Sequence, residues 1–162
     1  MDSLFVIGRA ENIKLPSLGA DKVPAKVDTG ADASSIWCSS ARLIDDKLEC
    51  IFFGSKSSFY TGKTHIFSKK EFTITRVANS FGHREVRFKV KIPIKVRGRL
   101  INATFTLADR SQKLYPILIG RSTLRGKFMV DVRKGSPMKG QEKKRRKRLI
   151  KELRPMRKEF LR

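Results

Sequence analysis

Asp28 stands where an apolar, strand-like approach ends in a Thr-Gly turn. Val23 to Val27 lead into Asp28-Thr29-Gly30-Ala31, and a second acid, Asp32, follows four residues after the first. A strand that ends in a sharp bend presents a side chain well. The carboxylate of Asp28 is therefore a candidate for acid–base catalysis. Asp-Thr-Gly is also a set of common turn residues, so an acid that only caps a turn is the alternative.

A second motif lies far downstream. Tyr115 to Ile119 form a short apolar stretch that Gly120-Arg121 closes, and Ser122 to Arg125 are compatible with a helix. Together the two motifs resemble an aspartic protease of the retropepsin class. In that family an Asp-Thr-Gly-Ala loop is followed, much later, by two apolar residues and a Gly, often with Arg next; Leu118-Ile119-Gly120-Arg121 matches this pattern.

The resemblance implies a mainly β fold, a retropepsin-like acid-protease half-barrel with one short helix after the Leu-Ile-Gly-Arg motif. It makes Asp28 the catalytic acid and predicts a homodimer, since each copy supplies one Asp and hydrolysis needs two. One Asp28 carboxylate would hold a proton while the other, as general base, activates water, and the pair would titrate as a unit. The resemblance also implies an ion pair between Asp32 and Arg121 and no cofactor. The residues that support the active loop would be Thr29, Gly30, Ala31, Asp32, Gly120 and Arg121.

Two alternating stretches, Phe72 to Val77 and Glu85 to Ile94, flank a turn at residues 79–83 and predict a hairpin. Retropepsins place their flap, the hairpin that closes over an extended peptide, between the two motifs. An ordinary surface hairpin is the alternative. The residues expected in the flap or against substrate are Arg76, Ser80, Phe81, Gly82, His83, Arg84 and Arg87.

Within the class, the chain is similar to a bacterial and archaeal retropepsin-like family once labelled ATP-dependent zinc proteases. Members accompany the enzyme that adds glutamates to a small-subunit ribosomal protein, so the resemblance implies a glutamate-rich or glutamylated substrate. The similarity covers about Phe5 to Val132. Further motifs that carry it are Ile7-Gly8-Arg9 with Glu11, Leu15-Pro16, Ser80-Phe81-Gly82-His83 with Glu85 and Arg87, and Asp109-Arg110-Ser111. Arg9 would either cross the dimer to the acid after the catalytic loop or be a solvated strand-end residue.

The chain has 162 residues, 40% hydrophobic composition and a net charge of +22. This length predicts one domain, residues 1–132, with an appendage, residues 133–162. The appendage holds 14 Lys or Arg against three Glu, which leaves +11 for each part. Both parts therefore favour an acidic partner, either nucleic acid or a polyanionic polypeptide.

The appendage begins with Arg133 to Pro137, a linker by composition, and continues with six consecutive basic residues, Lys143 to Arg148. Leu149, Leu153, Met156 and Phe160 recur at helical spacing, and Pro155 is expected to kink or interrupt that helix. The helix would either dock on the domain by its apolar stripe or contact RNA or the ribosome. The viral relatives put a terminal interface strand here, which leaves the mode of dimerisation open.

Other chemistries find little support. His65 and His83 are the only histidines and form no His-Glu-x-x-His, so no metal site is predicted. A Gly-x-Ser-x-Gly elbow and a phosphate-binding Gly loop are absent. Cys38 and Cys50 are expected to be buried thiols, and the chain is expected to be cytoplasmic, without a membrane span. The second hypothesis is a non-catalytic module of the same fold that binds RNA or ribosomal protein through its basic surface and tail.

Overall fold

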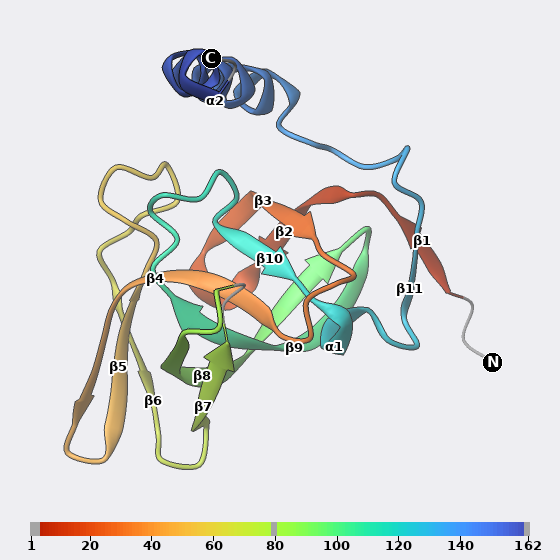
Figure 1. Ribbon diagram of the computed structural model, residues 1–162. Helices are drawn as coiled ribbons and strands as arrows, with labels where there is room; N and C mark the ends of the chain where they lie inside the picture. The colour runs from red at the N-terminus through yellow and green to blue at the C-terminus, as the bar shows by residue number, and fades with distance from the viewer. Residues whose placement is uncertain (1–3, 79–80, 161–162) are drawn as a thin grey trace.

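The computed structural model describes residues 4–78 and 81–160 and is dominated by β-strands, as the sequence predicts (Figure 1). A short helix follows the Leu-Ile-Gly-Arg motif and a long one forms the C-terminal part, which confirms the predicted fold class. The strands are β1 (Phe5–Ile7), β2 (Ala10–Leu15), β3 (Ala20–Val27), β4 (Ser34–Ile44), β5 (Lys47–Phe52), β6 (Thr64–Phe67), β7 (Phe72–Ala78), β8 (Arg84–Val96), β9 (Arg99–Ala108), β10 (Ile117–Ile119) and β11 (Phe128–Val130). The helical segments are η1 (Pro16–Leu18), α1 (Arg121–Leu124) and α2 (Lys139–Phe160).

The central sheet closes on itself. Its strand order is β10-β3-β2-β8-β9-β4, and β10 also pairs with β4, so these strands form a barrel. β5 and β6 extend the sheet beyond β4, and β7 pairs with the outer half of β8. Closure removes free edges from most of the barrel strands and gives their inward side chains a common interior.

Alternating apolar residues fill that interior. Ile13 and Leu15 of β2, Ile92 of β8, Phe105 of β9 and Ile117 of β10 are all almost completely buried. The alternation in β8 that predicts the hairpin therefore also supplies core residues at its inner end. Cys38 and Cys50 are buried free thiols, as predicted.

A small parallel sheet, β1 with β11, lies beside the barrel (Figure 1). The segment after β11, predicted as a linker, is hydrogen-bonded along the chain from Ile7 to Ala10: the amide of Asp131 donates to the Ile7 carbonyl at 2.9 Å and that of Ser136 to the Ala10 carbonyl at 2.7 Å. Gly8 is required by this contact, because a Cβ there would lie 2.0 Å from the Lys134 carbonyl oxygen.

Helix α2 is anchored to the barrel through its first turn. Glu142 accepts a bidentate pair of hydrogen bonds from Arg9, both 2.9 Å, and one from the Tyr115 hydroxyl at 2.7 Å. These partners lower the pKa of Glu142 to about 2, with Arg9 as the larger cause. Arg9 thus has an ion-pair partner in its own chain instead of being only solvated, and its contact across a dimer stays a prediction.

The predicted docking of α2 by its apolar stripe is also wrong. Leu149, Leu153, Met156 and Phe160 are exposed, because the first-turn anchor sets the direction of the helix and leaves the stripe in solvent. The helix also runs through Pro155 to Phe160 instead of ending there. The chain around Pro155 is exposed, so water can satisfy the carbonyl that loses its amide partner. None of the described helices is both long and apolar enough to cross a membrane.

Candidate active site

The loop that carries Asp28 is built around β10. β10 pairs in parallel with β3, which enters the loop, and antiparallel with β4, which leaves it. Leu118 is the Cα partner of Lys26 on one side and of Ser35 on the other. The two motifs that are some 90 residues apart in the sequence therefore meet in one layer, and the end of β10 lies directly against the loop.

Backbone hydrogen bonds fix the loop at both ends. The Asp28 amide donates to the Ile119 carbonyl at 2.9 Å, and the Arg121 amide donates to the Ala31 carbonyl at 2.8 Å. The Ser122 amide donates to the Asp32 carbonyl at 3.0 Å. Within the loop, the Gly30 amide donates to the Asp28 carboxylate at 3.0 Å. The half-buried carboxylate is thus held in one orientation at the surface of the barrel, where a substrate can reach it.

Gly120 is packed tightly beneath the loop. A Cβ at this position would lie 2.4 Å from the Ala33 carbonyl oxygen and 2.9 Å from that of Ala31. Its φ of −93° is ordinary, so the requirement for Gly is one of space and not of backbone conformation. Its amide donates to the Ser34 hydroxyl at 3.0 Å, and this hydroxyl also bonds the Thr123 hydroxyl at 2.6 Å.

Asp32 and Arg121 form the ion pair that the resemblance implies. Both side chains are largely exposed, so the pair contributes little to global stability. It connects the last acid of the loop to the first residue of α1. Thr29 lies exposed beside Asp28.

A cation that the sequence analysis did not assign to the site, Arg110, lies close to Asp28. Burial lowers the pKa of Arg110, the nearby charge of Arg87 lowers it further, and the carboxylate of Asp28 acts in the opposite direction. Arg110 is held by a 3.0 Å hydrogen bond from Nε to the Tyr115 carbonyl. Arg110 belongs to Asp109-Arg110-Ser111, one of the motifs that carry the family resemblance. That motif was the signal in the sequence that could have indicated Arg110 as a site residue.

The β7–β8 hairpin divides the three predicted flap arginines between its two faces. Arg87 pairs across the hairpin with Thr75 and, by the charge effect on Arg110, faces the site. Arg76 pairs with Val86, and the strict alternation of a strand puts both, together with Arg84, on the opposite face. At the hairpin tip Phe81, Gly82 and His83 are exposed. Ser80 lies outside the described residues.

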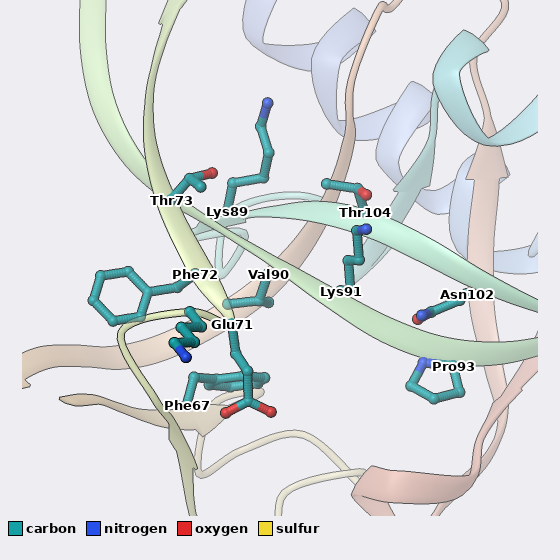
Figure 2. A pocket seen from close by; sticks show the side chains of 11 residues that line it. Phe67, Glu71, Phe72, Thr73, Lys89, Val90, Lys91, Pro93, Asn102 and Thr104 are labelled. Atoms are coloured by element: carbon teal, nitrogen blue, oxygen red, sulfur yellow. The ribbon is translucent and has the colours of Figure 1, made fainter.

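A cavity of about 560 Å³ lies apart from the Asp28 loop (Figure 2). It is at the base of the β7–β8 hairpin, and Figure 2 shows Lys89 and Lys91 pointing to the side of Thr104 while Glu71 and Phe67 lie at the other end. No residue of the Asp28 loop, of β10 or of α1 lines it.

Over residues 6–138 the chain matches the model of a family, RimB-like, described as retropepsin-like aspartic endopeptidase RimB. The chain belongs to the RimB-like family. The matched region contains the Asp28 loop, the β7–β8 hairpin and β10, whereas α2 begins just after it. The family assignment confirms the suspected resemblance and a protease-type fold.

Curated relatives of this RimB-like chain are named as probable alpha-L-glutamate ligases. Those of Desulfotalea psychrophila (strain LSv54 / DSM 12343) and Shewanella pealeana (strain ATCC 700345 / ANG-SQ1) are both 27% identical to it, over 78% and 80% of this chain. The matches cover 28% and 29% of those relatives, so the chain spans less than a third of their length. The ligase name therefore describes proteins with much additional sequence.

A solved structure shares the fold. The crystal structure of a protein of unknown function from Legionella pneumophila subsp. pneumophila str. Philadelphia 1 superposes with a TM-score of 0.62 at 21% identity, covering 82% of this chain and 97% of that one. Across the described part of this RimB-like chain, no group of three or more His, Cys, Asp or Glu side chains is placed to hold a metal ion.

Proposed function

We propose that the protein is an aspartic endopeptidase in which two copies of the chain bring their Asp28 carboxylates together and hydrolyse acidic, glutamate-rich or glutamylated peptide. The observation that carries the proposal is the fixed orientation of the Asp28 carboxylate by the Gly30 amide in a loop held by β10. The Asp-Thr-Gly motif occurs once in the sequence, and in this proposal a second copy of the chain supplies the second acid.

In the dimer the two carboxylates would share one proton, since two like charges at hydrogen-bond distance do not both ionise. The ionised acid takes a proton from water as the water attacks the peptide carbonyl carbon, and the protonated acid donates to the carbonyl oxygen. The resulting diol intermediate breaks down when the acid that took the proton from water gives it to the amine nitrogen, the other carboxylate removes a proton from a diol hydroxyl, and the C–N bond breaks to leave a carboxylic acid and an amine. This is acid–base chemistry that needs no covalent enzyme intermediate.

The small β1–β11 sheet is the proposed contact between copies. Its exposed apolar side chains are Leu4, Phe5, Val6, Met129 and Val132. Such a cluster beside α1, the helix that follows the catalytic motif, suits burial against a second copy. Met129, with 56% of its surface exposed, is the natural position for a test: Met129→Glu is expected to lower the mass seen in sedimentation and the activity together.

Two observations support an acidic substrate. Arg87 and Arg110 bring positive charge next to Asp28, and Arg110 has no acidic hydrogen-bond partner among the described residues. Guanidinium groups pair well with carboxylates. The curated relatives named as glutamate ligases also contain a region similar to this chain, which connects it to glutamate chemistry.

The test is digestion of a glutamate-rich peptide and a size-matched neutral peptide by the wild type and by Asp28→Asn. We expect the wild type to cleave the acidic peptide and Asp28→Asn to be inactive with an unchanged thermal unfolding temperature. Cleavage by Asp28→Asn would contradict the mechanism. Equal cleavage of both peptides would contradict the substrate assignment alone.

A further inference from the structure

Helix α2 turns a cationic face toward the β9–β10 loop. Gln141, Lys144, Arg145 and Arg148 lie against residues 111–114 of that loop, and their spacing of three, four and seven residues places them on one side of the helix. The apolar stripe lies on another side and is exposed. Figure 1 shows α2 lying over the end of the barrel that carries this loop.

Two adjoining cavities separate the helix from the barrel. One, of about 380 Å³, lies between α2 and the loop; the other, of about 430 Å³, continues from it to β3 and β10. They share Lys113, Leu114 and Arg145 as lining residues, so they adjoin each other, and the two together are here called the basic groove. Each volume is in the range of ordinary ligand sites, roughly 300–1,000 Å³.

The groove is lined by cations on both walls. The barrel contributes Arg9, Lys26, Arg110 and Lys113, and the helix contributes Lys144, Arg145 and Arg148. Among the lining residues of the two cavities the one acid is Glu142, in the larger cavity, and both of its oxygens are already bonded by Arg9 and Tyr115. Two other acids near the groove, Asp109 and Glu152, do not line it. The Asp109 carboxylate accepts a hydrogen bond from the Ser111 amide, and Glu152 forms an exposed ion pair with Arg148 at 3.5 Å.

This arrangement is electrostatically unfavourable when the groove holds only water. Lys113 of the barrel and Lys144 and Arg145 of the helix line the same cavity, and they form no ion pair among the described residues. At physiological salt, charges within roughly 8 Å still repel because screening is incomplete at that range. An anion bound between the two walls would convert this repulsion into attraction on both sides.

One end of the groove leads to the catalytic loop. Lys26, the second-to-last residue of β3, lines the groove and is two residues before Asp28 in the chain. Arg110 lines the groove and also lies close to Asp28. A chain that passes through the catalytic site can therefore continue into the groove.

We propose that the basic groove is a second binding site for substrate, which holds a run of carboxylate side chains of an acidic peptide outside the bond that is cleaved. This inference rests on the proposed peptidase function. It gives α2, which lies beyond the region matched to the family, a role in substrate affinity.

The surroundings favour peptide over RNA. Single-stranded RNA is generally held by bases stacked on aromatic rings, and the one aromatic ring in the groove, Tyr115, is buried, with its hydroxyl bonded to Glu142 and to the Met138 amide. Binding of an acidic peptide, by contrast, requires only cations spaced like the carboxylate side chains of successive residues. The groove supplies these along its whole length.

The test measures binding apart from cleavage. In the full-length Asp28→Asn background, a fluorescent glutamate-rich peptide is titrated at about 0.1 M salt, and anisotropy reports its affinity. The groove triple variant Lys144→Gln, Arg145→Gln, Arg148→Gln is expected to weaken binding by about tenfold or more and to reduce the salt dependence, because fewer ions are released on binding. The single barrel-wall variant Lys113→Gln is expected to weaken it by a smaller factor and leaves α2 untouched.

The matched control is Lys143→Gln, Arg146→Gln, Lys147→Gln, which removes the same charge from residues of the same helix that do not line the groove. It is expected to change the affinity by about twofold or less. Equal losses in both triples would overturn the proposal in favour of a general charge effect. An RNA oligonucleotide of equal charge serves as the competing ligand. If it binds more tightly than the peptide and loses affinity in the groove triple variant, the choice of peptide as the ligand would be overturned. Intact groove binding without cleavage by the wild type would refute the peptidase function and leave the groove site standing.

Discussion

The Asp28 loop and the β7–β8 hairpin are held in different ways. The loop is fixed by hydrogen bonds to β10 and α1, and it rests on a buried glycine and a buried serine. The hairpin is held through its pairing with itself and projects exposed apolar residues such as Ile74 and Val86. Small changes in packing at the loop are therefore expected to change stability and activity. Changes in the hairpin are expected to change substrate binding and to leave stability almost unaltered.

Among the substitutions that test this difference, Gly120→Ala should cause the largest loss of stability. Because backbone carbonyls occupy the space of the new Cβ, the loop has to move, and we expect a loss of about 3 kcal/mol or more in the free energy of unfolding together with loss of activity. Thermal or denaturant unfolding measures it. The control, Gly140→Ala in α2, meets nothing within 4 Å and should keep or slightly raise stability.

Ser34→Ala should have the next largest effect. The Ser34 hydroxyl is fully buried and bonds both the Gly120 amide and the Thr123 hydroxyl, so its loss leaves a buried donor unpaired at a cost of about 1–3 kcal/mol. Its neighbour is the control: the Ser35 hydroxyl is buried without a hydrogen-bond partner among the described residues. Ser35→Ala should be neutral or stabilising in the same unfolding assay, and equal losses at the two positions would contradict this account of the loop.

Arg87→Gln should hardly change stability. Its ion pair with Glu85 is partly exposed, so the loss should stay below about 1 kcal/mol. Since Arg87 faces the site, KM for an acidic peptide should rise by about tenfold with little change in kcat. Arg76→Gln, on the other face of the hairpin, should leave KM nearly unchanged. A larger rise in KM for Arg76→Gln than for Arg87→Gln would show that the hairpin turns its other face toward Asp28.

The sequence could predict the loop because its determinants are local motifs. Asp28 with its Thr-Gly turn and Gly120 after an apolar strand are recognisable one at a time, and the family pattern supplies their pairing. The location of Arg110 beside Asp28 depends on closure of the barrel between distant strands, which local periodicity does not encode. Part of the barrel core was likewise accessible through the alternation from Glu85 to Ile94, most of β8.

The C-terminal helix shows the opposite case. Its existence followed from residue spacing, but its docking was decided by three side chains far apart in the sequence, Arg9, Tyr115 and Glu142. A helical wheel shows which residues share a face and does not show which face is covered. The apolar stripe therefore suggested the wrong contact, and the cationic face toward the barrel could be found only from the structure.

The central claim is that two Asp28 carboxylates, one from each copy, form a single catalytic site. Its most direct test is to mix wild type with increasing amounts of Asp28→Asn at constant total concentration, after the subunits have been allowed to exchange, and to measure cleavage of a glutamate-rich peptide. If both acids are required, mixed dimers are inactive and the activity falls with the square of the wild-type fraction. A linear fall, in direct proportion to that fraction, would show that each chain acts alone and would contradict the account.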